Sequence, residues 1–178
     1  MTDDLLLDVL RQRWSPREFD LDYDLTPAEQ AALLEAARWA PSAGNSQPWA
    51  FHLVRRDATG WTSLLDALAG SSRPWASQAS ALVVNLAHIA VEDTDWTYSE
   101  FAIYDLGQAV AHMTIQAHAM GLACRQFRAF DKDAITAQLN VQPHWDVTTM
   151  TAIGRAAPTA QRGPRASTRE PAITWPRP

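Results

Sequence analysis

A stretch of almost uniformly apolar sequence, residues 98–120, most constrains what this chain can fold into. Its pattern predicts one long helix that ends at Gly121, and its large apolar side chains are spread around the whole cylinder: Ile103, Leu106, Val110, Met113, Ile115, Ala117 and Met120. A helix of this kind is buried, either in the core of its own chain or against a partner chain. The other elements must therefore cover it, alone or together with a second subunit.

Short helices and strands alternate around this stretch. Thr26, Pro27 and Glu29 form a helix start, with an N-cap, a first-turn proline and a capping-box glutamate, and Pro41 ends that helix. Apolar patterns predict helices at 3–12, 61–69 and 132–139, the last capped by Asp131, and strands at 49–54, 81–88, 122–127 and 147–153. The run ALVVNLAH at 81–88 is the best candidate for a buried central strand. Several connections are too short for a regular βαβ series, so we expect an α+β or mixed α/β fold.

Composition limits the class of protein. The chain has 178 residues, enough for one domain, with a net charge of −5 and a sequence pI of about 5.4. This acidity argues against a general nucleic-acid binder. The single cysteine, Cys124, excludes an internal disulfide and fits a reducing compartment. The N-terminus lacks a secretory signal and no apolar run could span a membrane, so we expect a cytoplasmic protein.

The chain changes character at Pro158. Residues 158–178 are rich in proline and arginine and poor in aliphatic residues, so they cannot build a core of their own. We therefore expect residues 1–157 to form the domain. Residues 158–178 are then either a disordered tail or an arm that packs on a partner chain.

Motifs for covalent, metal or hydrolytic chemistry are missing from the sequence. The five histidines have no zinc-ligand spacing with one another, with cysteine or with carboxylates, so we expect no metal site. There is no GxSxG elbow, no Walker loop and no GxGxxG after a strand. We interpret Asp105 as a packing or capping carboxylate and Cys124 as a small buried hydrophobe. If the chain is an enzyme, a cofactor supplies the chemistry and no catalytic side chain is expected.

The stretch RWSPR, residues 13–17, is a candidate anion site. Pro16 favours extended backbone at Ser15, and side chains two apart in an extended segment share a side. Arg13, Ser15 and Arg17 then present two guanidinium groups around a hydroxyl, a suitable arrangement for a phosphate or a carboxylate. Alternatively, both arginines lie on the surface or pair with the aspartates just downstream, at positions 20, 22 and 24.

The stretch APSAGNSQPW, residues 40–49, is a second candidate. Its small residues let backbone amides approach a flat ligand closely. The amides of Asn45 and Gln47 can satisfy a ring edge that offers both donors and acceptors, and Pro48 predicts extended backbone at Gln47. Taken alone, the stretch is equally consistent with a tight turn.

Together these stretches resemble the FMN-dependent nitroreductase family, over most of the chain. RWSPR is similar to the family's Arg-x-Ser-x-Arg/Lys, and APSAGNSQPW to its Pro-Ser-x-x-Asn-x-Gln-Pro-Trp. Residues 105–122 resemble its central helix, QFRAFD at 126–131 its short segment ending Gly-Phe-Asp, and 152–154 its final strand. The resemblance implies a nitroreductase-like α+β fold, with a central mixed or antiparallel sheet flanked by helices, in an intertwined homodimer with a C-terminal arm.

The resemblance also implies a cofactor, FMN, and residues that hold it. Those expected at the phosphate and the ribityl chain are Arg13, Ser15 and Arg17. Those expected to reach the flavin from the other subunit are Pro41, Ser42, Ala43 and Asn45, with Gln47 alongside. On the arm, Arg165 and Arg169 are the candidates for a basic pair at the phosphate, with Arg162 as third choice. The backbone amides of Arg128 and Ala129 are expected near flavin N5 and O4.

The sequence departs from the family's pattern in two places. Ala129 replaces a glycine, which strains the loop only if its φ is positive. The segments 58–80 and 89–99, where some members carry a long lid, are short. Four aromatic residues in or next to these segments either line a pocket or belong to the core, which we favour: Trp75, Trp96, Tyr98 and Phe101.

The resemblance implies an activity as well. We expect an oxidoreductase that uses NAD(P)H to reduce a small organic acceptor, such as a nitroaromatic compound or a quinone, by a ping-pong mechanism. One alternative is a protein of the same fold that binds or sequesters FMN with little or no turnover, and it is motivated by the short lid and by the departure at Arg128 and Ala129. Another is a degenerate dimeric module that no longer binds flavin.

Overall fold

The computed structural model describes residues 5–162; residues 1–4 and 163–178 lie outside the described part. The helices are α1 (Asp8–Gln12), α2 (Pro27–Arg38), α3 (Trp61–Asp66), α4 (Arg73–Ala76), α5 (Ala102–Ala119) and α6 (Lys132–Gln138), with a short 3-10 turn, η2 (Ala43–Asn45). The strands are β1 (Trp49–Arg55), β2 (Ala81–His88), β3 (Ala123–Phe127) and β4 (Trp145–Gly154). Within residues 5–162, no helix combines the length and the apolar character that crossing a membrane requires.

The four strands form one sheet in the order β1-β2-β4-β3, and every neighbouring pair is antiparallel. β2 is central and buried along its length up to Ala87, which confirms the prediction for ALVVNLAH. Asn85 lies opposite Thr149, and a register shift between Asn85 and Leu86 then leaves Thr148 without a partner on β2. The helices are not inserted between parallel strands, so the fold is α+β, as the family resemblance implies.

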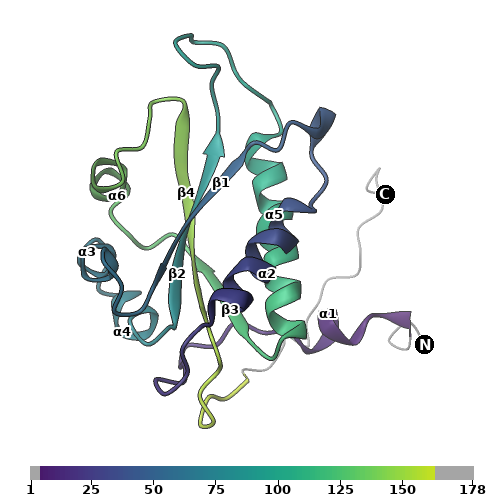
Figure 1. Ribbon diagram of the computed structural model, residues 1–178, viewed down its shortest axis with the longest axis vertical. Helices are drawn as coiled ribbons and strands as arrows, with labels where there is room; N and C mark the ends of the chain where they lie inside the picture. The colour runs from purple at the N-terminus through teal and green to yellow at the C-terminus, as the bar shows by residue number, and fades with distance from the viewer. Residues whose placement is uncertain (1–4, 163–178) are drawn as a thin grey trace, which may run out of the picture.

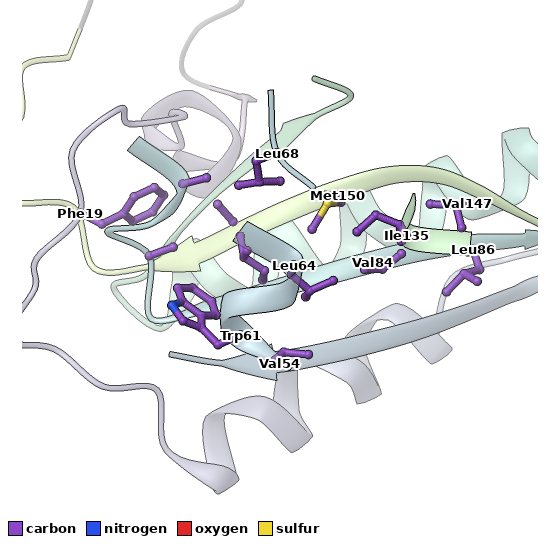
Figure 2. Close-up of a cluster of buried hydrophobic side chains, with 14 residues drawn as sticks. Phe19, Val54, Trp61, Leu64, Leu68, Val84, Leu86, Ile135, Val147 and Met150 are labelled. Carbon is purple, nitrogen blue, oxygen red and sulfur yellow. The ribbon is translucent and has the colours of Figure 1, made fainter. Parts of the chain in front are cut away.

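Helices cover both faces of the sheet (Figure 1). α2 and α5 pack together on one face, where Leu33, Ala109 and Met113 meet Val83 of β2. α3, α4 and α6 cover the other face, where Trp61, Leu64 and Ile135 pack against β2 and β4 (Figure 2). Successive side chains of a strand point to opposite faces of the sheet, so β2 contributes to the hydrophobic core on each face. Val83 faces α5, and Val84 faces α3 and α6.

The long helix is buried along only one side within a single chain. Its buried side is made of Ala102, Asp105, Leu106, Ala109, Val110, Met113, Thr114 and Ala117. On the opposite side Ile103 is 58% exposed and Tyr104 is 68% exposed. Burial in the core of its own chain therefore holds for one side of α5, and the partner-chain alternative stays a prediction for the other side.

Local sequence signals place the helix starts correctly. The capping box at Thr26 is formed, since the Glu29 N–H donates to Thr26 Oγ1 at 3.2 Å and the Thr26 N–H donates to Glu29 Oε2 at 2.8 Å. Asp131 caps α6 by accepting from the Ala134 N–H at 3.0 Å. Both starts are confirmed because a cap depends on residues only three positions apart.

Three expected helices differ from the structure. α1 begins at Asp8 rather than residue 3, α5 begins at Ala102 rather than residue 98, and the helix expected at 61–69 ends at Asp66. The backbone after Asp66 is drawn into tertiary pairing instead, because the Asp131 N–H donates to the Ala67 carbonyl at 2.8 Å and the Ala69 N–H donates to the Ala129 carbonyl at 3.0 Å. The four-residue helix α4 that follows is not predicted by the sequence.

The core assignment of the four aromatic residues is correct only in part. Trp75 packs on the core beneath α3 and meets Phe127 edge-on. Trp96 and Phe101 are 76% and 52% exposed, so the prediction that they belong to the core is wrong. Both lie in the connection that leads into α5, where no element among residues 5–162 covers them. Tyr98 stacks on His88, with ring centroids 3.8 Å apart.

Candidate functional site

A cavity of about 550 Å³ lies between α5, the end of α1 and strands β3 and β4. Its wall is mainly apolar: Leu10, Ile103, Leu106, Gly107, Val110, Ala111 and Ile115. Its polar groups come from four separate parts of the chain: Arg13, Thr114, Gln126, Thr148 and Thr149. An apolar wall with a few polar groups and one cation is typical of a site for a small organic ligand that carries an anionic group.

Arg13 reaches this cavity because α1 ends immediately before it. Its backbone is extended, with φ −59° and ψ 144°, and its N–H donates to the Val9 carbonyl at 3.1 Å. The chain therefore leaves the helix at the point that the sequence predicts. A guanidinium group beside an apolar wall favours an anionic ligand over a neutral one.

Ser15 and Arg17 border a second cavity, of about 440 Å³, which Arg125 also lines. Arg125 Nη1 donates to the Ser15 carbonyl at 3.0 Å, and the pKa of Arg125 is lowered, first by burial and second by the charge of Arg17. The structure thus does not gather Arg13, Ser15 and Arg17 around a single cavity. It places them along one segment with a cavity on either side.

The downstream aspartates do not neutralise Arg17. Asp24 forms an ion pair with Arg56 at 2.7 Å, and Asp20 accepts from the Asp22 N–H at 3.0 Å. Among residues 5–162, no carboxylate forms a salt bridge with Arg17 or Arg125. The pairing alternative read from the sequence is therefore wrong for Arg17, and its positive charge is available to a ligand.

The loop from Pro41 to Gln47 is fixed to the start of α5 by a buried carboxylate. Asp105 Oδ2 accepts from the Ala43 N–H at 2.9 Å, and Gln108 Nε2 donates to Asp105 Oδ1 at 3.1 Å. Asp105 is only 2% exposed, which fits its interpretation as a packing or capping carboxylate. The loop is thus held by its backbone. The side chains of Pro41, Asn45 and Gln47 are exposed and lie outside the lining of the large cavity of their own chain.

The prediction of extended backbone at Gln47 is wrong. Gln47 has a φ of +47°, its N–H donates to Ser42 Oγ at 3.0 Å, and its carbonyl accepts from the Trp49 N–H at 2.8 Å. These local hydrogen bonds outweigh the preference that Pro48 imposes on the residue before it. Gly44 and Asn45 also have positive φ, so the loop is a sequence of tight turns whose backbone N–H groups at residues 45–47 are bonded within the loop.

Hydrogen bonds to the Ala129 carbonyl hold the segment that follows β3 in place. The Ala129 carbonyl accepts from the Ala69 N–H at 3.0 Å and from Ser72 Oγ at 2.5 Å, and Arg128 Nη1 donates to the Thr148 carbonyl at 2.7 Å. Outside the strand ladders, the described part of the chain offers no backbone carbonyl to the N–H of Arg128 or Ala129. These donors are therefore available to a ligand.

Ala129 is accommodated without backbone strain. Among residues 5–162, the non-glycine residues with positive φ are Asn45, Gln47, Asp57, Asp93 and Asn140, so Ala129 has a negative φ. An alanine at this position is an ordinary residue in an ordinary conformation. The strain that a positive φ would have caused is absent.

Two polar pairs next to the large cavity were not identified from the sequence as site residues. Asn85 on β2 donates to Thr149 and Thr151 on β4, and Gln126 on β3 donates to Thr114 on α5. The available signal was an asparagine in the middle of an apolar strand. The threonines carry no such signal, because only the antiparallel register brings them beside Asn85.

Metal and thiol chemistry have no visible support in the described part of the chain. Residues 5–162 hold no cluster of three or more histidine, cysteine or acidic side chains that could bind a metal ion. Cys124 is buried, and burial raises the pKa of its thiol to about 12. It packs with α2 and α5 as a small hydrophobe.

The C-terminal arm can be followed only to residue 162. Arg162 Nη2 donates to the carbonyls of Arg11, Gln12 and Arg13 at the end of α1. Arg165 and Arg169, the first choices for the basic pair, lie outside the described residues. Of the three candidates, Arg162 is thus the one that the structure places beside the RWSPR segment.

Comparison with known proteins supports the family. The sequence model of the nitroreductase family matches residues 10–89. An oxidoreductase that contains FMN is 28% identical, with 85% of this chain and 77% of that chain covered and a TM-score of 0.80. An FMN-dependent nitroreductase from Clostridium difficile R20291 is 22% identical, with 85% and 87% covered and a TM-score of 0.69.

A third solved structure shows the same fold. It is CLA-ER, an enone reductase of gut-bacterial fatty acid saturation metabolism, which is 21% identical, with 94% of this chain and 96% of that chain covered and a TM-score of 0.76. The resemblance expected from the motifs is therefore confirmed: the chain is nitroreductase-like, in sequence over residues 10–89 and in fold along most of its length.

Proposed function

We propose that this protein is an FMN-dependent oxidoreductase that uses NAD(P)H to reduce a small organic acceptor, such as a nitroaromatic compound or a quinone, by a ping-pong mechanism. The observation that carries the proposal is the cavity of about 550 Å³ that joins Arg13 to the apolar wall of α5 and to the ends of β3 and β4. Bound FMN supplies the two-electron transfer between a nicotinamide donor and an organic acceptor. The 28% identical relative that contains FMN supports the same cofactor here.

The residues present fit such a cofactor. In the proposal Arg13 holds the phosphate, because it is the member of the RWSPR segment that borders the large cavity. Ser15 and Arg17 support the phosphate and the ribityl chain from the other side of the segment. Arg162, on the carbonyls at the end of α1, adds a cation. A charge-assisted hydrogen bond of this kind contributes about 1.5–3 kcal/mol.

The amides of Arg128 and Ala129 are proposed to donate to the flavin ring. Preorganised N–H donors stabilise negative charge that develops on a bound ring during reduction. The negative φ of Ala129 supports binding of FMN, because it removes the backbone strain that would weaken the affinity for the flavin. The acceptor class is consistent with an exposed ring face, and the enone reductase CLA-ER has the same fold.

A homodimer would complete the site. The side of α5 that carries Ile103 and Tyr104 is exposed, and so are the side chains of Pro41, Asn45 and Gln47. In the proposal α5 packs against a second copy, the loop 41–47 of one subunit contacts the flavin held by the other, and the arm that begins at residue 158 packs on the partner. A cytoplasmic location stays a prediction that agrees with a single buried cysteine.

One experiment tests the proposed function directly. The purified protein is incubated with FMN, passed through a desalting column, and its visible spectrum is recorded before and after anaerobic addition of NADH or NADPH. We expect a bound flavin band that bleaches with at least one donor and returns when an acceptor is added. A bound band that persists with both donors would favour the sequestering protein. A colourless protein would contradict both functions.

A further inference from the structure

Asn85 is a buried amide at the centre of the sheet, beside the large cavity. It is fully buried on the face of β2 that packs toward α5. Its Nδ2 donates to Thr149 Oγ1 at 3.0 Å and to Thr151 Oγ1 at 2.9 Å. The strand register places both threonines there, since Asn85 lies opposite Thr149 and Val83 opposite Thr151. Thr149 borders the cavity, whereas Thr151 does not.

These two hydrogen bonds determine what Thr149 offers to a ligand. With the Asn85 amide oriented so that Nδ2 faces the two threonines, both of its hydrogens are used and both threonine oxygens act as acceptors. The hydroxyl hydrogen of Thr149 must therefore point to another acceptor, and residues 5–162 provide none in a hydrogen bond to it. Because Thr149 lines the cavity, its hydroxyl group is a donor to whatever the cavity holds.

Gln126 supplies the complementary acceptor. Thr114 Oγ1 donates its only hydrogen to the Val110 carbonyl at 2.7 Å, so it accepts from Gln126 Nε2 at 2.6 Å. This fixes the orientation of the Gln126 amide and leaves Oε1 for a ligand, and both Gln126 and Thr114 line the cavity. Gln126 lies opposite Thr151 and is thus a diagonal neighbour of Thr149 across the β3–β4 ladder.

We propose that Thr149 and Gln126 form a donor–acceptor pair that binds an edge where a ring N–H adjoins a carbonyl or a ring nitrogen, and that Asn85 is the positioning residue of this pair. The inference rests on the proposed function, in which the ring is the flavin of FMN. The unpaired Asn85 Oδ1 supports it. An acceptor left unsatisfied at a fully buried position is costly, and it is retained here in a residue that orients a cavity-lining hydroxyl group.

Two isosteric variants, Thr149→Val and Thr151→Val, test the ligand contact. Each removes one acceptor of Asn85, so both should lower the thermal unfolding temperature to a similar extent. Only Thr149→Val removes a group from the cavity. Titration with FMN, followed by flavin fluorescence, should show binding about three- to tenfold weaker for Thr149→Val and less than twofold weaker for Thr151→Val. Riboflavin should show the same ratio, since the phosphate is not involved.

Equal FMN affinity in the two variants, whether both are weakened or both unchanged, would overturn the inference while leaving the proposed function intact. Failure of the unmodified protein to bind FMN would overturn the proposed function and this inference with it. The two failures are thus distinguishable in one titration series.

The positioning role of Asn85 is tested by a double-mutant cycle. Asn85→Leu should weaken FMN binding to a similar extent as Thr149→Val and shift the absorption maximum of the bound flavin. The double variant should bind no more weakly than either single variant, because both changes remove the same contact. Additive losses, or an unchanged flavin spectrum in Asn85→Leu, would show that Asn85 acts on the fold and not through Thr149.

Discussion

Cys124 shows at the scale of one residue how the fold controls reactivity. Its sulfur is buried on β3, and burial raises the thiol pKa to about 12, so the neutral thiol is the stable form at neutral and mildly alkaline pH. The thiolate is the reactive species. We therefore expect no reaction of the folded protein with a disulfide reagent such as DTNB at pH 8 on the time scale of minutes.

The control for this expectation is the same assay in denaturant, which should release one equivalent of chromophore per chain because the sequence contains one cysteine. Native protein that reacts as fast as the denatured chain would mean that β3 opens readily, and the pKa of Cys124 would then not describe the state that reacts.

Single residues also mark where sequence reasoning fails. The backbone of Gln47 depends on a bond from its N–H to the hydroxyl of Ser42, five positions away, and no pre-proline preference anticipates that bond. Thr149 and Thr151 acquire their roles only through pairing with Asn85, more than sixty positions away in the chain. Arg13, in contrast, was identified as a candidate because RWSPR carries its signal locally.

The start of α2 gives a prediction at the scale of one element. Replacement of Thr26 by alanine removes the hydroxyl that accepts from the Glu29 N–H, and it leaves a first-turn donor without its cap. We expect the free energy of unfolding to fall by about 1 kcal/mol. Urea unfolding followed by circular dichroism measures it, on the protein without added FMN.

Thr62→Ala is the matched control, because Thr62 is an exposed threonine inside α3 and not a cap. Its effect should stay within about 0.5 kcal/mol of zero. Equal losses in the two variants would mean that the capping box at Thr26 contributes nothing beyond the threonine itself.

Element boundaries were predictable where a cap or a proline sets them, as at Thr26 and Asp131. They were not predictable between α3 and α4, where backbone bonds to the segment around Ala129 decide the path. The same bonds orient the amides proposed to face the flavin. The connection between α3 and α4, which the periodicity of the sequence predicts poorly, therefore helps to form the candidate site.

At the scale of the whole molecule, the antiparallel sheet and its two helical layers could be predicted from the family resemblance but not from the hydrophobic periodicity of the sequence alone. The strand patterns give four strands but not their order, because nothing local states that β4 lies between β2 and β3. That order brings Gln126, Thr149 and Asn85 onto adjacent strands beneath α5. The candidate site is therefore a property of the topology, and only its arginines and its loop could be found from the sequence.

The exposed side of α5 carries the last prediction, that two copies of the chain associate through it. Tyr104 is 68% exposed on the longest helix, beside the exposed Ile103 and Phe101, and large apolar side chains that are exposed next to one another are typical of an interface. Light scattering during gel filtration should give twice the chain mass for the unmodified protein. Tyr104→Asp should shift it toward the mass of one chain, because a carboxylate is costly to bury against an apolar surface.

Loss of the dimer should also reduce FMN retention on the desalting column, since the loop 41–47 of the partner would no longer reach the cavity. Leu21→Asp is the control, because Leu21 is similarly exposed, at 62%, but lies outside α1 and α5. A monomeric unmodified protein would reject the dimer. A dimer that survives Tyr104→Asp would place the interface elsewhere. A Tyr104→Asp monomer that retains FMN fully would show that Arg13 and the walls of its own cavity suffice to hold the cofactor, and that loop 41–47 has another role.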